Sequence, residues 1–305
     1  MTRVALAPEP ADYAADAVRR AGGTVVGLDD APEGLVWTRP TSWGEIGPAL
    51  DRAPTVRWVQ LPFAGVEEAV AAGVLRPGVQ WACAKGVYSE PVAEHALALA
   101  LAALRSVPRY ARETSWTGQS AVTLYDAPVV VLGGGGITAS LLRLLEPFRA
   151  DVTVVRRDAG REVPGAARTV GVNRLDDVLA GALVVVLALA LTPDTERVVD
   201  ARRLARMRPD AVLVNVARGR HVDTDALVEA LHDGRIGAAA LDVTDPEPLP
   251  DGHPLWSLPT CLVTPHTANP WATAQPLLAR RVQENVRRAA AGEPLLGLVD
   301  VDAGY

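Results

Sequence analysis

The chain has 305 residues, of which 49% are apolar and 22% charged, and its formal net charge is −6. This length fits two domains that each bury a core, and the composition is that of a globular protein, which excludes a disordered or fibrous chain. The acidic balance argues against nucleic acid as a main partner, and the apolar runs are too short to span a membrane. We therefore expect neither a nucleic acid nor a membrane as a partner.

The two cysteines, Cys83 and Cys261, form no C-x-x-C pair and no metal-ligand spacing. Such isolated cysteines are typical of small buried residues in a reducing compartment. The N-terminal sequence lacks an apolar segment of the kind found in secretory signal peptides. We accordingly expect a cytoplasmic protein with no metal site.

The first part of the chain alternates short apolar runs with helical patterns. Alternation at this spacing is typical of a parallel sheet covered by helices. The predicted strands are 3–7, 24–28, 35–38, 57–61 and 79–82, and the predicted helices are 11–21, 41–50 and 66–72.

Residues 90–107 form a long and almost wholly apolar helical stretch. A helix of this kind needs cover on most sides, from a domain interface or from a second subunit. It is our reason for expecting a homodimer. The segment 108–127 that follows lacks a clear pattern and is predicted to be an extended connection.

A second alternating series follows. Its predicted strands are 129–132, 152–155, 182–188, 211–216, 238–243 and 261–266, with a helix at 223–232 and a final amphipathic helix at 271–291. The sequence therefore predicts an α/β protein with two doubly wound parallel-sheet domains.

A glycine-rich turn stands between the strand 129–132 and the helix after it. Gly133 can make the tight turn, Gly135 can admit a pyrophosphate, and Gly136 and Ile137 begin the helix. This is the context of a dinucleotide fingerprint, in which phosphates sit at a helix N-terminus. Thr138 stands where the fingerprint has its third glycine. The alternative is a flexible turn that binds nothing.

The next strand ends in Arg156 and Arg157. NAD-binding proteins carry an acidic residue near this position, which holds the ribose hydroxyls. Two guanidinium groups suit a 2′-phosphate instead, so we expect NADP to be preferred over NAD. The alternative is a solvated basic turn.

The C-terminal half contains the phrases NVARG, VDTDAL, LDVTDPEPLP, HPLW and TPH in that order. With LPFAGVE, SEPVAEHALAL and LTPDT upstream, these phrases resemble the D-isomer-specific 2-hydroxyacid dehydrogenase family, including glyoxylate/hydroxypyruvate reductases. The resemblance extends from about residue 57 to about residue 288. It implies a flavodoxin-like substrate domain, 1–88 with 283–305, and a Rossmann domain that binds NAD(P), 89–282.

The resemblance also implies the roles of individual residues. Arg218, Glu247 and His266 occupy the family's catalytic positions, and Arg218 also binds substrate. Asp242 would contact the nicotinamide end of the cofactor. Backbone N–H groups of the loop 63–66, at Ala64 and Gly65, would meet the substrate carboxylate.

The chemistry of these groups supports the same roles. Reduction of a ketone places negative charge on its oxygen, so a cation and a proton donor are needed there. The planar guanidinium of Arg218 can bind a 2-oxo acid through two parallel hydrogen bonds. His266 can transfer the proton, and Glu247 would raise the pKa of His266. Asp245 is an alternative to Glu247, although the spacing to Pro248 favours Glu247.

The other histidines receive structural interpretations. His95 is expected to be a hydrogen-bonded interface residue, and His221, His232 and His253 are expected to lie at the surface.

The predicted function is hydride transfer between NAD(P)H and a small 2-oxo or 2-hydroxy acid of D configuration, in the reducing direction. The alternative is a regulatory protein of the same fold that senses nicotinamide cofactors. A third alternative is a relative that oxidises a small anion such as formate or phosphite. Formate is disfavoured because formate dehydrogenases carry Gln where Glu247 stands.

Overall fold

The computed structural model describes residues 1–39 and 42–300, and they divide into two compact units. One unit combines Met1–Tyr88 with the segment from Pro270 onward, and the other is Ser89–Asn269. The expected helix start at Thr41 and the tail 301–305 lie outside the described residues.

The first unit is a five-stranded parallel sheet in the order β2-β1-β3-β4-β5. This is the flavodoxin-like order. Its strands are β1 (Arg3–Ala7), β2 (Thr24–Val26), β3 (Gly34–Trp37), β4 (Trp58–Gln60) and β5 (Gln80–Ala82). Its helices are α1 (Asp12–Arg20), α2 (Ile46–Arg52), α3 (Glu67–Ala71) and α11 (Trp271–Ala291), and a 3₁₀ turn, η1 (Trp43–Glu45), precedes α2.

The second unit is a seven-stranded parallel sheet in the order β12-β11-β10-β9-β6-β7-β8. Counted from β6, this is the Rossmann order 3-2-1-4-5-6 with one further strand. Its strands are β6 (Pro128–Leu132), β7 (Asp151–Arg156), β8 (Arg168–Gly171), β9 (Val184–Leu187), β10 (Val212–Asn215), β11 (Ala238–Leu241) and β12 (Cys261–Val263). Sequence reasoning missed β8, whose residues are only partly buried and include Arg and Thr rather than a continuous apolar run.

Helices cover both faces of this sheet, as expected for a buried parallel sheet. The helices of this unit are α4 (Ser89–Leu104), α5 (Val107–Tyr110), α6 (Gly136–Leu145), α7 (Leu175–Leu179), α8 (Ala201–Leu204), α9 (Thr224–His232) and α10 (Pro254–Ser257), with 3₁₀ turns η2 (Glu146–Phe148), η3 (Val172–Arg174) and η4 (Gly219–His221). The predicted α/β class with two parallel sheets is confirmed.

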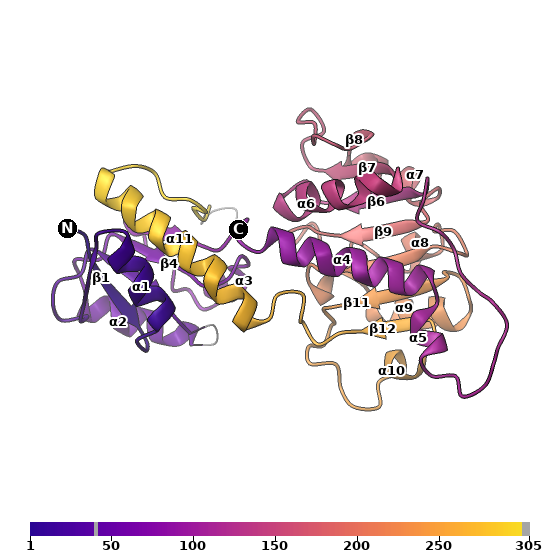
Figure 1. Cartoon of the computed structure of the whole chain (residues 1–305), viewed down its shortest axis with the longest axis horizontal. Helices are drawn as coiled ribbons and strands as arrows, with labels where there is room; N and C mark the ends of the chain where they lie inside the picture. The colour runs from indigo at the N-terminus through magenta and orange to yellow at the C-terminus, as the bar shows by residue number, and fades with distance from the viewer. Residues whose placement is uncertain (40–41, 301–305) are drawn as a thin grey trace. The chain divides into compact units, whose positions relative to one another are not determined.

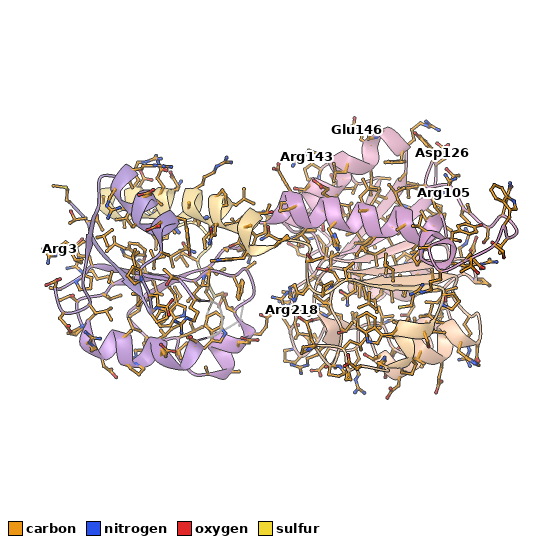
Figure 2. All side chains as sticks on the ribbon, turned by 60° about the horizontal axis from the view of Figure 1, so that its bottom comes forward. Arg3, Arg105, Asp126, Arg143, Glu146 and Arg218 are labelled. Atoms are coloured by element: carbon orange, nitrogen blue, oxygen red, sulfur yellow. The ribbon has the colours of Figure 1, made fainter. Side chains whose placement is uncertain are left out.

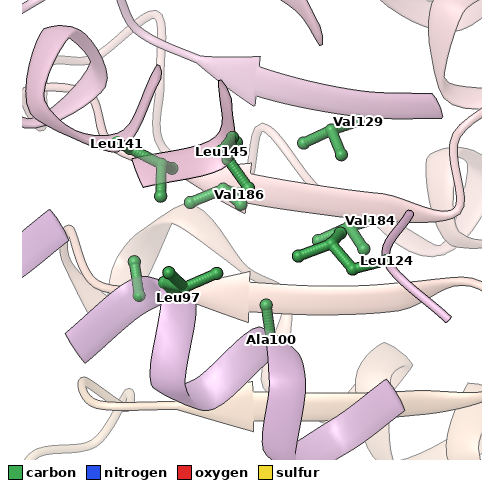
Figure 3. Close-up of a pocket in the computed structure, with 9 residues that line it drawn as sticks. Leu97, Ala100, Leu124, Val129, Leu141, Leu145, Val184 and Val186 are labelled. Carbon is green, nitrogen blue, oxygen red and sulfur yellow. The ribbon is translucent and has the colours of Figure 1, made fainter. Parts of the chain in front are cut away.

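The apolar helix α4 packs against α6 and against strands β10 and β11 of its own unit (Figure 1). Ala96, Leu99 and Ala103 are buried in this contact. Because alanines fill little space, a small cavity lined only by apolar side chains remains between α4, α6 and strands β6 and β9 (Figure 3). The sheet thus supplies much of the cover that α4 needs, and the homodimer stays a prediction.

The second crossing between the units lies at Asn269–Pro270, whereas the sequence predicted it at 282–283. The reason is that α11 packs along its length on the first unit. It contacts α1, buries Leu278 and Val282, and sets the Trp271 ring edge-on against Tyr13 at 5.8 Å (Figure 1).

Among the described residues no helix is both long and apolar enough to cross a membrane. The same part of the chain holds no cluster of three or more His, Cys, Asp or Glu side chains arranged for a metal ion.

Candidate active site

The glycine-rich turn has the geometry that a dinucleotide requires. Gly133 has a φ of 105°, and a Cβ at this position would lie 2.2 Å from the carbonyl oxygen of Ala188, so only glycine fits. Gly135 is the N-cap of α6, and a Cβ there would meet no atom within 4 Å. Gly135 and Gly136 are exposed, which leaves the helix N-terminus open to a pyrophosphate.

Thr138 stands where the fingerprint has its third glycine, and its side chain is accommodated within the turn. Its side chain is fully buried, and its hydroxyl donates a hydrogen bond to the carbonyl of Gly133 at 2.8 Å. Threonine therefore fits inside the turn, because its hydroxyl finds a partner there.

Arg156 ends β7, the strand beside β6. Its Cδ would lie 3.2 Å from a Cβ on Gly134, so the side chain runs over the glycine-rich turn. Its guanidinium donates from Nη1 to the carbonyl of Arg161 at 3.1 Å and is partly exposed. Arg157, the next residue, is exposed. The turn, the open helix end and a neighbouring cation together fit a dinucleotide phosphate.

Arg218 follows β10 and lies at the periphery of the second unit (Figure 2). The buried side chain of Asn215 shapes the backbone around it. Its amide donates to the carbonyl of Arg218 at 2.9 Å, and its oxygen accepts from the N–H of Ala217 at 3.0 Å. The Arg218 guanidinium donates to the carbonyl of Ala217 at 2.7 Å. Sequence reasoning used the NVARG phrase but gave Asn215 no role.

Gly219 brings the Arg218 loop against the loop that carries Glu247. A Cβ on Gly219 would lie 1.9 Å from the carbonyl oxygen of Thr244 and 2.6 Å from the N of Asp245. The backbones therefore touch where these two loops cross. In the second loop, the N–H of Thr244 donates to Glu247 Oε2 at 3.4 Å.

Glu247 and His266 form the central pair of the site. Glu247 Oε1 lies 2.6 Å from His266 Nδ1, and the side chains are 41% and 53% exposed. The hydrogen bond that His266 donates to Glu247 raises the pKa of His266 above its ordinary value, although burial and Arg218 oppose this effect. Burial raises the pKa of Glu247, but His266, Thr244 and Arg218 outweigh it, so this pKa is lowered. The pair is thus suited to hold a proton on the imidazole.

Because Glu247 is an acceptor, the imidazole donates from Nδ1 and presents Nε2 away from the pair. Among the described residues, the hydrogen-bond partner of the His266 Nδ1 is Glu247 and not Asp245, the alternative acid. The main-chain carbonyl of Asp245 accepts from the hydroxyl of Thr224. The geometry favours Glu247 over Asp245 as the partner of His266.

Asp242 directly follows β11, and its main-chain carbonyl accepts a hydrogen bond from the N–H of His266. Its carboxylate accepts from the N–H of Thr267 at 2.8 Å and of Ala268 at 3.0 Å, and from the Thr264 hydroxyl at 2.6 Å. Burial raises its pKa, but these bonds and one from His95 outweigh burial and leave it lowered. The side chain is 1% exposed. A contact between Asp242 and the nicotinamide stays a prediction.

Ala64 and Gly65 belong to the other unit, in the loop after β4. Phe63 is 37% exposed, and its carbonyl accepts from the N–H of Ala84 at 2.7 Å. Ala64 is exposed and Gly65 partly so. Their role toward the substrate stays a prediction.

Two histidine predictions need comment. His221 was expected at the surface but is fully buried, and its ring nitrogens lie 3.0 Å from the carbonyl of Thr195 and 3.3 Å from that of Leu189. His95 was expected at an interface. Within its unit it lies 3.1 Å from Thr264 Oγ1 and 3.2 Å from Asp242 Oδ1.

Comparison with known sequences gives a consistent result. A family model for the NAD-binding domain of D-isomer specific 2-hydroxyacid dehydrogenases matches residues 97–268. An uncharacterised protein of Corynebacterium melassecola is 41% identical over 261 residues, or 84% of this chain and 86% of the relative. A D-3-phosphoglycerate dehydrogenase of Mycobacterium tuberculosis is 36% identical over 253 residues, which are 81% of this chain. The chain spans 46% of that enzyme's length.

Solved structures agree. A D-isomer specific 2-hydroxyacid dehydrogenase from Xanthobacter autotrophicus, in complex with NADPH and MES, is 30% identical with a TM-score of 0.86 over 100% of this chain and 99% of that chain. An NADPH-dependent glyoxylate/hydroxypyruvate reductase from Sinorhizobium meliloti, in complex with NADP and sulfate, is 25% identical with a TM-score of 0.83 over 100% of both chains. This chain belongs to the D-isomer specific 2-hydroxyacid dehydrogenase family and is an oxidoreductase that binds NAD(P).

Proposed function

We propose that the chain is an NADPH-dependent reductase of small 2-oxo acids that forms D-2-hydroxy acids. The observation that carries the proposal is the contact of 2.6 Å between Glu247 and His266. The loop that carries Glu247 packs against the Arg218 loop at Gly219. His266 is a proton donor and Arg218 is a cation, and these are the two groups that reduction of a carbonyl to an alcohol requires.

The residues divide the work as follows. Arg218 binds the carboxylate and the carbonyl oxygen of the acid and stabilises the negative charge that develops there. His266 donates the proton on Nε2 to that oxygen, while Glu247 stabilises the imidazolium before transfer and solvent then restores the proton. Hydride for C2 comes from the reduced nicotinamide when it is bound. One hydride and one proton convert the ketone into the alcohol.

The preference for NADPH rests on Arg156. Its side chain runs over the glycine-rich turn from the strand where NAD-binding relatives carry an acidic residue. A charge-assisted hydrogen bond contributes about 1.5–3 kcal/mol, so one such bond, reduced by solvent exposure, gives roughly tenfold discrimination. The two nicotinamide-bound structures described above contain NADPH or NADP.

A two-carbon or three-carbon 2-oxo acid is the substrate class that we infer. The support is the likeness to the glyoxylate/hydroxypyruvate reductase of Sinorhizobium meliloti.

We also propose a homodimer, because the connection after α5 exposes apolar side chains, with Trp116 at 99% and Tyr125 at 50%.

The test is a screen of glyoxylate, hydroxypyruvate, pyruvate and larger 2-oxo acids, each with NADPH and with NADH. We expect turnover of the small acids and a higher kcat/KM with NADPH. Tight NADPH binding with no turnover of any acid would favour the regulatory alternative, in which the cofactor is sensed rather than used.

A further inference from the structure

We propose that His95 is a positioning residue for His266, acting through Asp242 and Thr264. Helix α4 directs the imidazole of His95 at Thr264, in the loop after β12. This proposal rests on the proposed function of His266 as the proton donor.

The His266 backbone is held in an unfavourable conformation. Its φ is 49°, in the left-handed region that few non-glycine residues adopt and that persists only when the surroundings fix it. Its own N–H donates to the carbonyl of Asp242 at 2.9 Å. The next two residues, Thr267 and Ala268, donate their N–H groups to the Asp242 carboxylate. Asp242 therefore fixes the loop on both sides of the His266 side chain.

His95 fixes Asp242 in turn. The Thr264 hydroxyl donates to Asp242 Oδ1 at 2.6 Å, so toward His95 both Thr264 and Asp242 are acceptors. The His95 Nε2 lies 3.1 Å from one and 3.2 Å from the other, and must carry the proton that it shares between them. His95 is 20% exposed and comes from α4, a helix well packed on the sheet. The donor is thus anchored in a different element from the loop that it supports.

Without this donor, the buried carboxylate of Asp242 loses one hydrogen bond and the freedom of the loop 264–268 increases. His266 should then leave its left-handed conformation part of the time, and Nδ1 should move away from Glu247. The charged groups around His266 are Glu247, Arg218 and Asp242. Because the hydrogen bond donated to Glu247 is the main cause of the raised pKa of His266, loosening this contact should lower that pKa.

The experiment uses the whole chain with ¹⁵N-labelled histidine. The chain has five histidines, so each imidazole can be followed separately through a pH titration. The variants are His95→Ala, which removes the donor, His95→Gln, which keeps an N–H near the position of Nε2, and Thr264→Val. His232→Ala is the matched control, because its side chain is 79% exposed. Each variant is also assayed for reduction of glyoxylate and for NADPH affinity.

We expect His95→Ala and Thr264→Val to lower the pKa of His266 and to reduce kcat by about tenfold, at unchanged NADPH affinity, since small misplacement of a catalytic group is costly. His95→Gln should restore most of both, and His232→Ala should leave His266 unchanged. If His95→Ala does not fold, Thr264→Val still tests the chain of contacts from His95 to Asp242, because the Thr264 hydroxyl contacts both.

An unchanged His266 titration in both His95→Ala and Thr264→Val would overturn the proposal, and so would a Gln variant no better than Ala. The titration needs no turnover. If His266→Ala proves fully active, the proposed function fails, while the titration still decides whether His95 positions His266.

Discussion

A methyl group on Gly219 is a small change that should separate the loop that carries Arg218 from the loop that carries Glu247. Gly219 lies next to Arg218, and its Cα packs on the backbone of Thr244 and Asp245. Its φ is not among the positive values of the described glycines, so alanine adds a steric contact rather than backbone strain. Gly219→Ala therefore tests the distance between the loops.

The size of the effect follows from the contact. The new Cβ would lie 1.9 Å from the Thr244 carbonyl oxygen, whereas ordinary contact begins at 3.4 Å. Both partners are backbone, so the loops must part by about 1.5 Å, or the strain must spread over several residues. A misplacement of roughly 1 Å can cost about 10²-fold in rate, or ~2.7 kcal/mol of barrier. We expect kcat/KM for glyoxylate to fall by about that factor.

The assay compares Gly219→Ala with Gly181→Ala, a glycine of the same unit where a Cβ would meet no atom within 4 Å. Steady-state kinetics give kcat/KM, NADPH titration gives cofactor affinity, and thermal melts show whether each variant is folded. Near-normal kcat/KM in a folded Gly219→Ala would refute the idea that close packing of these loops matters for catalysis.

Three further changes test single groups. Glu247→Gln should lower the raised pKa of His266; since reduction needs protonated His266, the decline of kcat with rising pH should begin at lower pH, and an identical pH profile would speak against the pair. Arg156→Asp should shift kcat/KM from NADPH toward NADH by roughly tenfold, and equal values for both cofactors in the unmodified protein would return Arg156 to a solvated turn. Arg218→Lys should remain strongly impaired, because an ammonium lacks the guanidinium fork; wild-type kcat/KM would show that charge alone suffices.

The sequence predicted the architecture well because its signals are local. Continuous apolar strands such as VVVL at 129–132, followed by glycines, specify a buried strand and a phosphate turn. Signals that depend on long-range packing were weaker. The edge strand β8 lacks an apolar run, and the start of α11 could be assigned to its unit only from its contacts with α1.

The same distinction holds for the site. Arg218, Glu247 and His266 stand in recognisable phrases, and the structure brings Glu247 and His266 into contact. His95 and Thr264 carry no local sign of their role, because it arises from a contact between residues 169 positions apart. His221 is similar: polar neighbours in sequence suggested a surface residue, but the fold buries it between two carbonyl groups.

The central claim is that His266 supplies the proton during NADPH-dependent reduction of a small 2-oxo acid. The most direct measurement is kcat for glyoxylate reduction by His266→Ala, with NADPH affinity measured on the same sample. We predict that kcat falls by at least about 10²-fold while NADPH binds as in the unmodified protein. A kcat close to that of the unmodified protein would contradict the claim.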